Sequence, residues 1–137
     1  MRIKIILCLL IVSSPVFGQE IGSVENENHS IKLLKSDNLY AVVFSDVNSR
    51  GQHVYESFNF PNKETIYEIM MNGFNVKNNH QVFVLTDNDT VVKFIFNKVK
   101  GVVMLKINQN NSKIETTSTS TQLNREQLIQ LFSEKTS

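Results

Sequence analysis

Three runs near the middle of the chain predict strands that are apolar on both faces. They cover residues 81–86, 91–97 and 102–108. β-branched and aromatic residues fill them and short polar turns separate them, which is typical of neighbouring antiparallel strands. Alternate side chains of a strand point to opposite faces of its sheet, so these strands need cover on both sides. This requirement constrains the fold more than any other feature of the sequence.

Three more strands are predicted before these runs and one after them. Segments 31–35 and 39–47 flank a turn-forming Ser-Asp-Asn cluster, which predicts a hairpin, and segment 53–60 begins after a second break. The polar segment 113–121 contains strand-forming residues but has little to bury. It is therefore expected as an edge strand or as a linker.

A first amphipathic helix is predicted over residues 62–73. Pro61 precedes it, where the missing N–H costs nothing, and Gly73 is expected to end it. Its apolar residues recur every three or four positions, as on one face of a helix. They are Ile66, Ile69, Met70 and Phe74.

A second helix is predicted over residues 125–134. Asn124 is suited to be its N-cap, and Gln127 stands where a capping box requires it. Leu123 and Leu128 are spaced as a hydrophobic staple around this start. The beginning of this helix is therefore specified locally.

The resulting element order is β-β-β-α-β-β-β-(β)-α, which indicates an α+β fold. We expect an antiparallel sheet of about five to seven strands with two amphipathic helices on one face. Residues 31–135 are predicted as a single domain. Residues 19–30 are polar and lack periodicity, so they are predicted as a flexible lead-in.

The first 18 residues have the pattern of a signal peptide. Arg2 and Lys4 precede a short apolar run, and Val16 and Gly18 suit the positions before a cleavage site. The run is far shorter than the roughly 20 apolar residues that a membrane span needs. Cys8 lies inside the run rather than at the cut, which argues against a lipoprotein. We expect cleavage after Gly18 and a periplasmic or secreted protein.

Charge and cysteine content exclude several classes of function. The sequence has 14 Lys+Arg against 13 Asp+Glu, too balanced for a nucleic-acid partner. Cleavage removes Cys8, the only cysteine, so the mature chain would have neither thiol chemistry nor a disulfide. Hydrophobic burial alone must then stabilise the fold. The abundance of Lys, Asn and Ile is typical of AT-rich bacterial genomes.

No catalytic residues, metal ligands or cofactor site are predicted. The sequence contains no nucleophile elbow, P-loop or dinucleotide-binding glycine motif. Its histidines, His29, His53 and His80, do not have the spacing of metal ligands. Glu64 and Glu68 lie one helical turn apart, and we expect both to face water beside Lys63.

Two groups of residues are candidates for contacts with other molecules. His53, Tyr55 and Ser57 recur every second residue on one predicted strand face and form a candidate ligand-contacting patch. The second group lies on the face of the apolar strands that a two-layer fold leaves uncovered. It consists of Val91, Ile95, Val102 and Met104. A protein partner, self-association or the helix at 125–134 would shield this face.

The leading functional hypothesis is therefore an exported, non-enzymatic binding or protein-interaction domain. The alternative is an extracytoplasmic hydrolase without a recognisable motif, with catalytic residues drawn from Asp46, His53, Tyr55 or His80. A third hypothesis is a structural protein that only self-associates. A concave site in which titratable groups converge would favour the enzyme.

Protein isolated from its native host is expected to begin at Gln19. Intact mass spectrometry measures this directly, because removal of residues 1–18 leaves one defined mass. A mass that still includes Met1, or a lipid attached to Cys8, would contradict the cleavage prediction.

Overall fold

The structure is a computed structural model that describes residues 19–49, 54–86, 90–111 and 116–133. The predicted signal peptide at residues 1–18 lies outside the described residues, and so does His53. In the described part of the chain, eight strands and two helices follow one another in the order β-β-β-β-α-β-β-β-β-α. The α+β class predicted from the sequence is confirmed.

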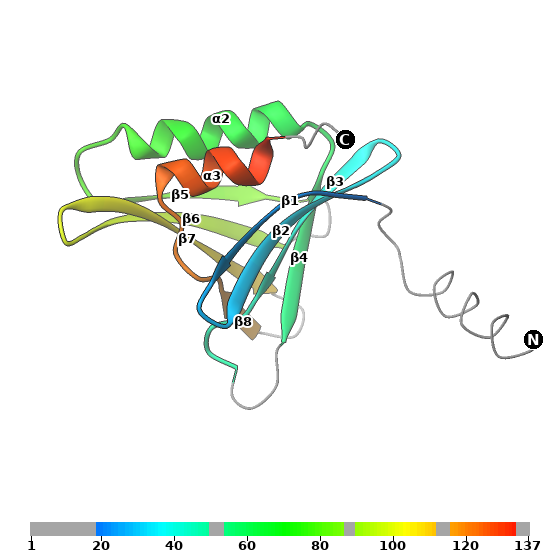
Figure 1. The fold of residues 1–137 in the computed structure, drawn as a ribbon, viewed down its shortest axis with the longest axis horizontal. Helices are drawn as coiled ribbons and strands as arrows, with labels where there is room; N and C mark the ends of the chain where they lie inside the picture. Colours follow the sequence, from blue (N-terminus) through cyan, green and yellow to red (C-terminus); the bar gives the residue numbers. More distant parts are fainter. Residues whose placement is uncertain (1–18, 50–53, 87–89, 112–115, 134–137) are drawn as a thin grey trace, which may run out of the picture.

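The strands form two antiparallel sheets of four strands each (Figure 1). The first sheet consists of β1 (Gln19–Asn26), β2 (His29–Ser36), β3 (Leu39–Ser45) and β4 (Tyr55–Phe60), and α2 (Lys63–Phe74) follows it. The second consists of β5 (His80–Leu85), β6 (Val91–Val99), β7 (Val102–Asn111) and β8 (Thr116–Thr119), and α3 (Arg125–Phe132) follows it. The prediction of one larger sheet was wrong in this respect. The same succession, a four-stranded meander and then a helix, occurs twice.

The segment predicted as a flexible lead-in is instead strand β1, which pairs with β2. Ile21 and Val24 are its buried apolar residues. They are three positions apart in the sequence and not two, and the pairing with β2 has a register shift between Glu20 and Gly22. The two-residue alternation of a strand is therefore not visible in the sequence. The edge strand was missed because its few apolar residues do not alternate.

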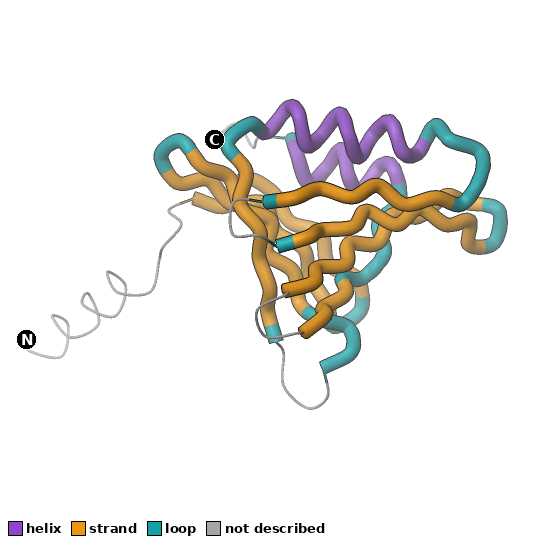
Figure 2. The backbone as a smooth tube through the Cα atoms, turned by 180° about the vertical axis from the view of Figure 1, so that it is seen from behind, coloured by secondary structure: helices purple, strands orange, loops and turns teal. Residues whose placement is uncertain are grey.

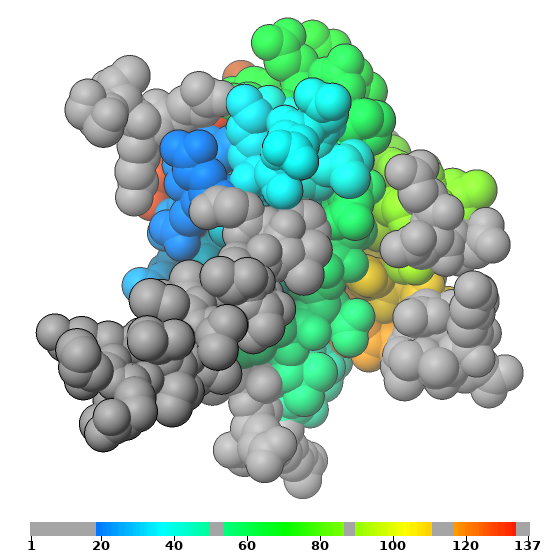
Figure 3. Space-filling model, turned by 90° about the vertical axis from the view of Figure 1, so that its right-hand side faces the viewer, coloured from blue at the N-terminus to red at the C-terminus, as the bar shows by residue number. Residues whose placement is uncertain are grey.

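Strand β4 pairs with β3 and with no strand of the second sheet, although the two lie side by side on the face shown in Figure 3. The Ser57 carbonyl accepts a hydrogen bond from the Gln109 side-chain amide of β7 at 2.9 Å. Farther along β4, the Phe58 ring lies 6.2 Å from that of Phe94 on β6. Strand β4 therefore contacts side chains of the second sheet through its edge at Ser57 and through the Phe58 ring.

Helix α2 packs against β6 and β7 through its predicted stripe, of which Ile66, Met70 and Phe74 are buried and Ile69 is partly exposed. Gly73 has a different role from the one predicted. It lies within the helix, which continues to Phe74, and a Cβ there would collide with the Phe96 ring. The glycine permits close packing of the helix on β6.

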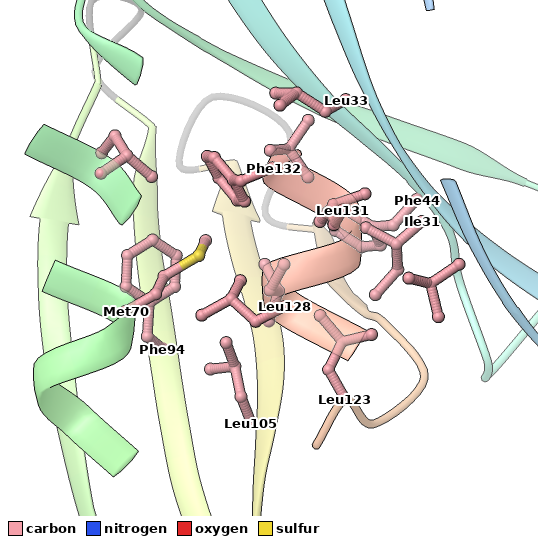
Figure 4. Packing of buried hydrophobic residues seen from close by; sticks show 14 of the residues in the cluster. Ile31, Leu33, Phe44, Met70, Phe94, Leu105, Leu123, Leu128, Leu131 and Phe132 are labelled. Atoms are coloured by element: carbon pink, nitrogen blue, oxygen red, sulfur yellow. The ribbon is translucent and has the colours of Figure 1, made fainter. Parts of the chain in front are cut away.

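Helix α3 begins as predicted. The Asn124 side chain accepts a hydrogen bond from the Gln127 backbone N–H at 2.8 Å, and the Gln127 side chain accepts one from the Asn124 N–H at 2.9 Å. The helix lies between the two sheets and beside α2, with Leu128 and Leu131 pointing into the core (Figure 4). It approaches β1 closely, since a Cβ at Gly22 would collide with the Leu131 carbonyl.

One continuous core joins both sheets and both helices. Its largest fully buried side chains include Phe44 from the first sheet, Phe94 and Phe96 from the second, and Met70 and Leu128 from the helices. The helices lie together on the inner side of the second sheet (Figure 2). The two meanders therefore fold around shared apolar contacts.

Truncation of Phe94 to alanine is expected to lower the free energy of unfolding by about 3 to 5 kcal/mol. Its side chain is 0% exposed in the middle of the core. The matched change Glu68→Ala removes an exposed helix side chain and is expected to cost well under about 1 kcal/mol. Urea denaturation measures both. Equal midpoints would mean that the assigned faces are wrong.

Candidate functional site

The outer face of the second sheet is the side of β5, β6 and β7 that points away from the helices. On β6, Val92, Phe94 and Phe96 are buried, whereas Val91 and Ile95 are only partly buried. This alternation follows from the pleat of a strand. The apolar side chains of the outer face are Phe83, Leu85, Val91, Ile95, Val99, Val102 and Met104.

Phe83, Leu85 and Val102 are the most exposed of these side chains, at 60%, 70% and 53%. Leu85 stands opposite Val91 in the ladder, so two apolar side chains are neighbours at one end of the face. At the other end, Val102 stands opposite Val99 in the hairpin that joins β6 and β7. The face thus presents two apolar regions.

Lysines lie between the two apolar regions. Lys93 stands opposite Phe83, and its Nζ lies 5.4 Å from the centre of the Phe83 ring. Such a contact is a cation–π interaction, which holds the ammonium group over the ring. Lys106 stands opposite Ile95 on the neighbouring strand. The outer face is therefore apolar with positive charge at its centre.

The structure places the predicted interaction residues on this face but does not bury them. Val91, Ile95 and Met104 are partly exposed and Val102 is exposed. Cover by the helix predicted at 125–134 was the wrong alternative. Helix α3 buries Leu128, Leu131 and Phe132 in the core, on the opposite side of the sheet.

Phe83 and Leu85 were not included in the predicted interaction group, although they are its most exposed neighbours. The same alternation that selects Val91 and Ile95 on β6 selects them on β5, where the burial pattern is strictly alternating. The signal was thus present in the sequence. What the sequence lacked was the pairing that sets Leu85 beside Val91.

Tyr55 and Ser57, from the predicted ligand-contacting patch, lie two residues apart on β4 and are exposed. The third member, His53, lies outside the described residues. The Ser57 carbonyl is bound by the Gln109 amide, which ties this strand to β7. The patch stays a prediction.

Asp46, a residue of the hydrolase hypothesis, connects the two sheets. Only 9% of its surface is exposed, and its Oδ1 accepts hydrogen bonds of 3.1 Å from the backbone N–H groups of Asn48 and Thr119. Next to it, the Val47 N–H donates to the Thr119 carbonyl at 2.8 Å. Both backbone groups of Thr119, at the end of β8, are thus bound to the segment that follows β3.

His80, another residue of that hypothesis, lies far from Asp46. Its ring stacks on Phe96 with centroids 4.8 Å apart, and its Nδ1 lies 3.0 Å from the Asn78 carbonyl. Three strand spacings and three residues along the strand separate it from Thr119, which Asp46 binds, a distance of about 15 Å or more. The fold does not bring these two side chains together.

No group of three or more His, Cys, Asp or Glu side chains close enough to hold a metal ion occurs among the described residues. His29 instead lies with its Nδ1 3.1 Å from the Ser45 hydroxyl, on the neighbouring part of the first sheet. Neither helix of the described residues has the length and apolar composition that a membrane span requires.

A cleft of about 420 Å³ lies between α2 and α3. Lys63, Glu64 and Glu68 of α2 line it together with Ile129 and Phe132 of α3. The two glutamates are exposed, as the sequence predicted. Exposed charged side chains of this kind are typical of the solvated face of a helix.

A second cleft of about 480 Å³ is polar and lies where the turn between β1 and β2 approaches the segment before α3. Glu27, His29, Lys106 and Thr121 are among its lining residues.

Comparisons with protein-family models, curated proteins and solved structures find no match to this chain. The outer face of the second sheet is thus the surface on which a functional argument rests.

Replacement of Asp46 by alanine is expected to lower the free energy of unfolding by about 1 to 3 kcal/mol, because two backbone N–H groups lose their acceptor. Asp46→Asn keeps an acceptor oxygen at the same position and is the matched control, with a smaller expected loss. Urea denaturation of both variants measures the difference. A loss for Asp46→Asn as large as that for Asp46→Ala would show that charge, not the hydrogen bonds, connects the sheets.

Proposed function

We propose that this protein is an exported, non-enzymatic binding domain and that the outer face of the second sheet docks a protein partner. The observation that carries the proposal is the exposure of Phe83, Leu85 and Val102 on a sheet face that no described helix or strand covers. Single exposed apolar residues are common on proteins, but a group of them on one sheet face is typical of an interaction site.

Burial of the apolar side chains of this face would contribute favourable free energy to docking. Burial of about 300 Å² of apolar surface contributes on the order of 7 kcal/mol before the costs of association. The aromatic ring of Phe83 is a rigid contact group of the kind that dominates binding energies at interfaces. Specificity must come from the polar groups around it.

Lys93 and Lys106 define the chemistry of the partner. Both lie among the apolar side chains of the face, and Lys93 is held over the Phe83 ring. A partner with carboxylates between two groups of apolar side chains would complement this surface. We therefore propose a protein partner whose contact surface is apolar with acidic side chains at its centre.

The binding hypothesis is preferred to the hydrolase hypothesis because of what the candidate catalytic residues do. Asp46 is bound to backbone amides that connect the sheets, and His80 stacks against the core residue Phe96. Both side chains therefore have roles in folding. Export rests on the leader sequence at residues 1–18 and is part of the same proposal.

Photo-crosslinking tests the proposal in the native host. A crosslinking amino acid at Leu85, on the outer face, is expected to capture one defined partner. The matched control at Lys32, an exposed residue of the first sheet, is expected not to capture it. Ile95→Glu, introduced in the protein that carries the crosslinker, places a carboxylate opposite Lys106, where it would repel an acidic partner. It is expected to reduce capture at least about tenfold while the protein stays folded.

Two results would contradict the proposal. One is a folded Ile95→Glu protein that crosslinks the same partner as efficiently as the unaltered face. The other is equal crosslinking from Leu85 and Lys32. Circular dichroism of the purified variants verifies that they are folded.

A further inference from the structure

We infer that the edge of β5 pairs with β5 of a second copy of this chain. Strand β5 is at the end of the second sheet and pairs only with β6. An edge strand presents N–H and C=O groups that a further strand can bind. The inference concerns this edge and does not depend on the partner proposed for the outer face.

The register shows which groups of β5 point outward. The Thr86 N–H donates to the Thr90 carbonyl at 3.0 Å, so this pair exchanges hydrogen bonds. Bonded and non-bonded pairs alternate in an antiparallel ladder, so the residues at even positions of β5 bond to β6. The backbone groups of Gln81, Phe83 and Leu85 therefore point away from the sheet.

Each of the other three edges has an outward backbone group that is hydrogen-bonded to another segment. In β1, the Ser23 carbonyl accepts a hydrogen bond of 3.1 Å from the Gln130 side chain. In β4, the Ser57 carbonyl accepts one from Gln109, and in β8 both backbone groups of Thr119 are bound to the segment after β3. Among the described residues, no hydrogen bond reaches the outward backbone groups of β5.

The composition of β5 also lacks the features that protect a free edge. It contains no Lys, Arg, Asp, Glu, Pro or Gly, and its pairing with β6 has no register shift. Strand β1, in contrast, has two glutamates and a register shift, and β8 has only four residues. Natural proteins use charges, bulges and short strands to prevent pairing between edges, and β5 uses none of them.

The absence of charge favours a second copy as the occupant. Around a two-fold axis each group meets its own counterpart, so a charged edge would repel itself and an uncharged edge does not. The charged residues of α2 also lie away from β5, since Lys63, Glu64 and Glu68 line the cleft toward α3. On the side of β5, α2 instead presents Thr65, which lines a cleft with Val84 and Leu85.

That cleft, of about 190 Å³, determines where the axis passes. Pro61 and Thr65 line it together with Val84 and Leu85, so they lie beside the C-terminal end of β5. An axis beside Val82 places the second copy farther from these residues than an axis beside Val84 does. It pairs Gln81 with Phe83 of the second copy in both directions, which forms four backbone hydrogen bonds. The two outer faces then become one continuous sheet surface.

The contact is small, so the dimer is expected to be weak. Six residues of one strand are far fewer than the 20 to 30 residues that each partner contributes to a standard interface of about 800 Å² per side. We expect a dissociation constant on the order of 10 μM for the chain that begins at Gln19.

Single cysteines test the register, because the chain from Gln19 contains no other thiol. In the proposed pairing, the Cα atoms at Val82 lie about 4.5 Å apart, within the range of a disulfide. Val82→Cys is therefore expected to form a disulfide-linked dimer on mild oxidation. Val84→Cys, on the same strand and face, is the control, since its two copies lie about 13 Å apart. Equal dimer formation by the two variants overturns the inference.

Replacement of Gln81 by proline tests the edge without an added thiol. Its N–H points outward, so proline removes a donor for the second copy and no bond to β6. Analytical ultracentrifugation is expected to show at least about tenfold weaker association for Gln81→Pro than for the control Gln81→Ser. The inference is overturned if Gln81→Ser is monomeric at 100 μM or if the two variants associate equally. A loss of partner crosslinking without a change in association counts only against the proposed function of the outer face.

Discussion

Helix α3 holds the two sheets together, because its apolar side chains fill the space between them. Leu128 and Leu131 are fully buried, and the close approach of Leu131 to β1 is possible only because residue 22 is glycine. Each helix packs against the sheet formed by the other half of the chain, α2 on β6 and β7 and α3 chiefly on β1 and β2. Neither meander therefore has its own cover, and the two halves depend on each other for a core.

The same packing determines which surfaces stay available. Since both helices lie on the inner side of the second sheet, its outer face keeps Phe83 and Leu85 in contact with water. Polar side chains secure the contacts between the sheets: Gln109 of β7 binds the edge of β4, and Asp46, after β3, binds the edge of β8. Within the part of the chain that the structure describes, no such side chain binds the edge of β5.

Binding through an exposed sheet face and pairing through a free edge are compatible in one protein. A two-fold pairing of β5 would place two outer faces side by side and double the number of docking sites, which increases avidity for a partner with two matching surfaces. Lys93 would remain over Phe83, one strand away from the axis. Such an arrangement uses the uncovered parts of the second sheet and leaves the core unchanged.

The sequence alone determined the local elements. The capping box at Asn124, the stripe around Met70 and the alternation on β6 depend on neighbours a few residues apart, so they predicted the helices and most strands. Tertiary structure decided the division into two sheets, the pairing of β1 and the role of Asp46, whose bond to Thr119 spans 73 residues. Hydrogen bonds to sheet edges and the covered face of a sheet depend on distant segments, which local patterns do not specify.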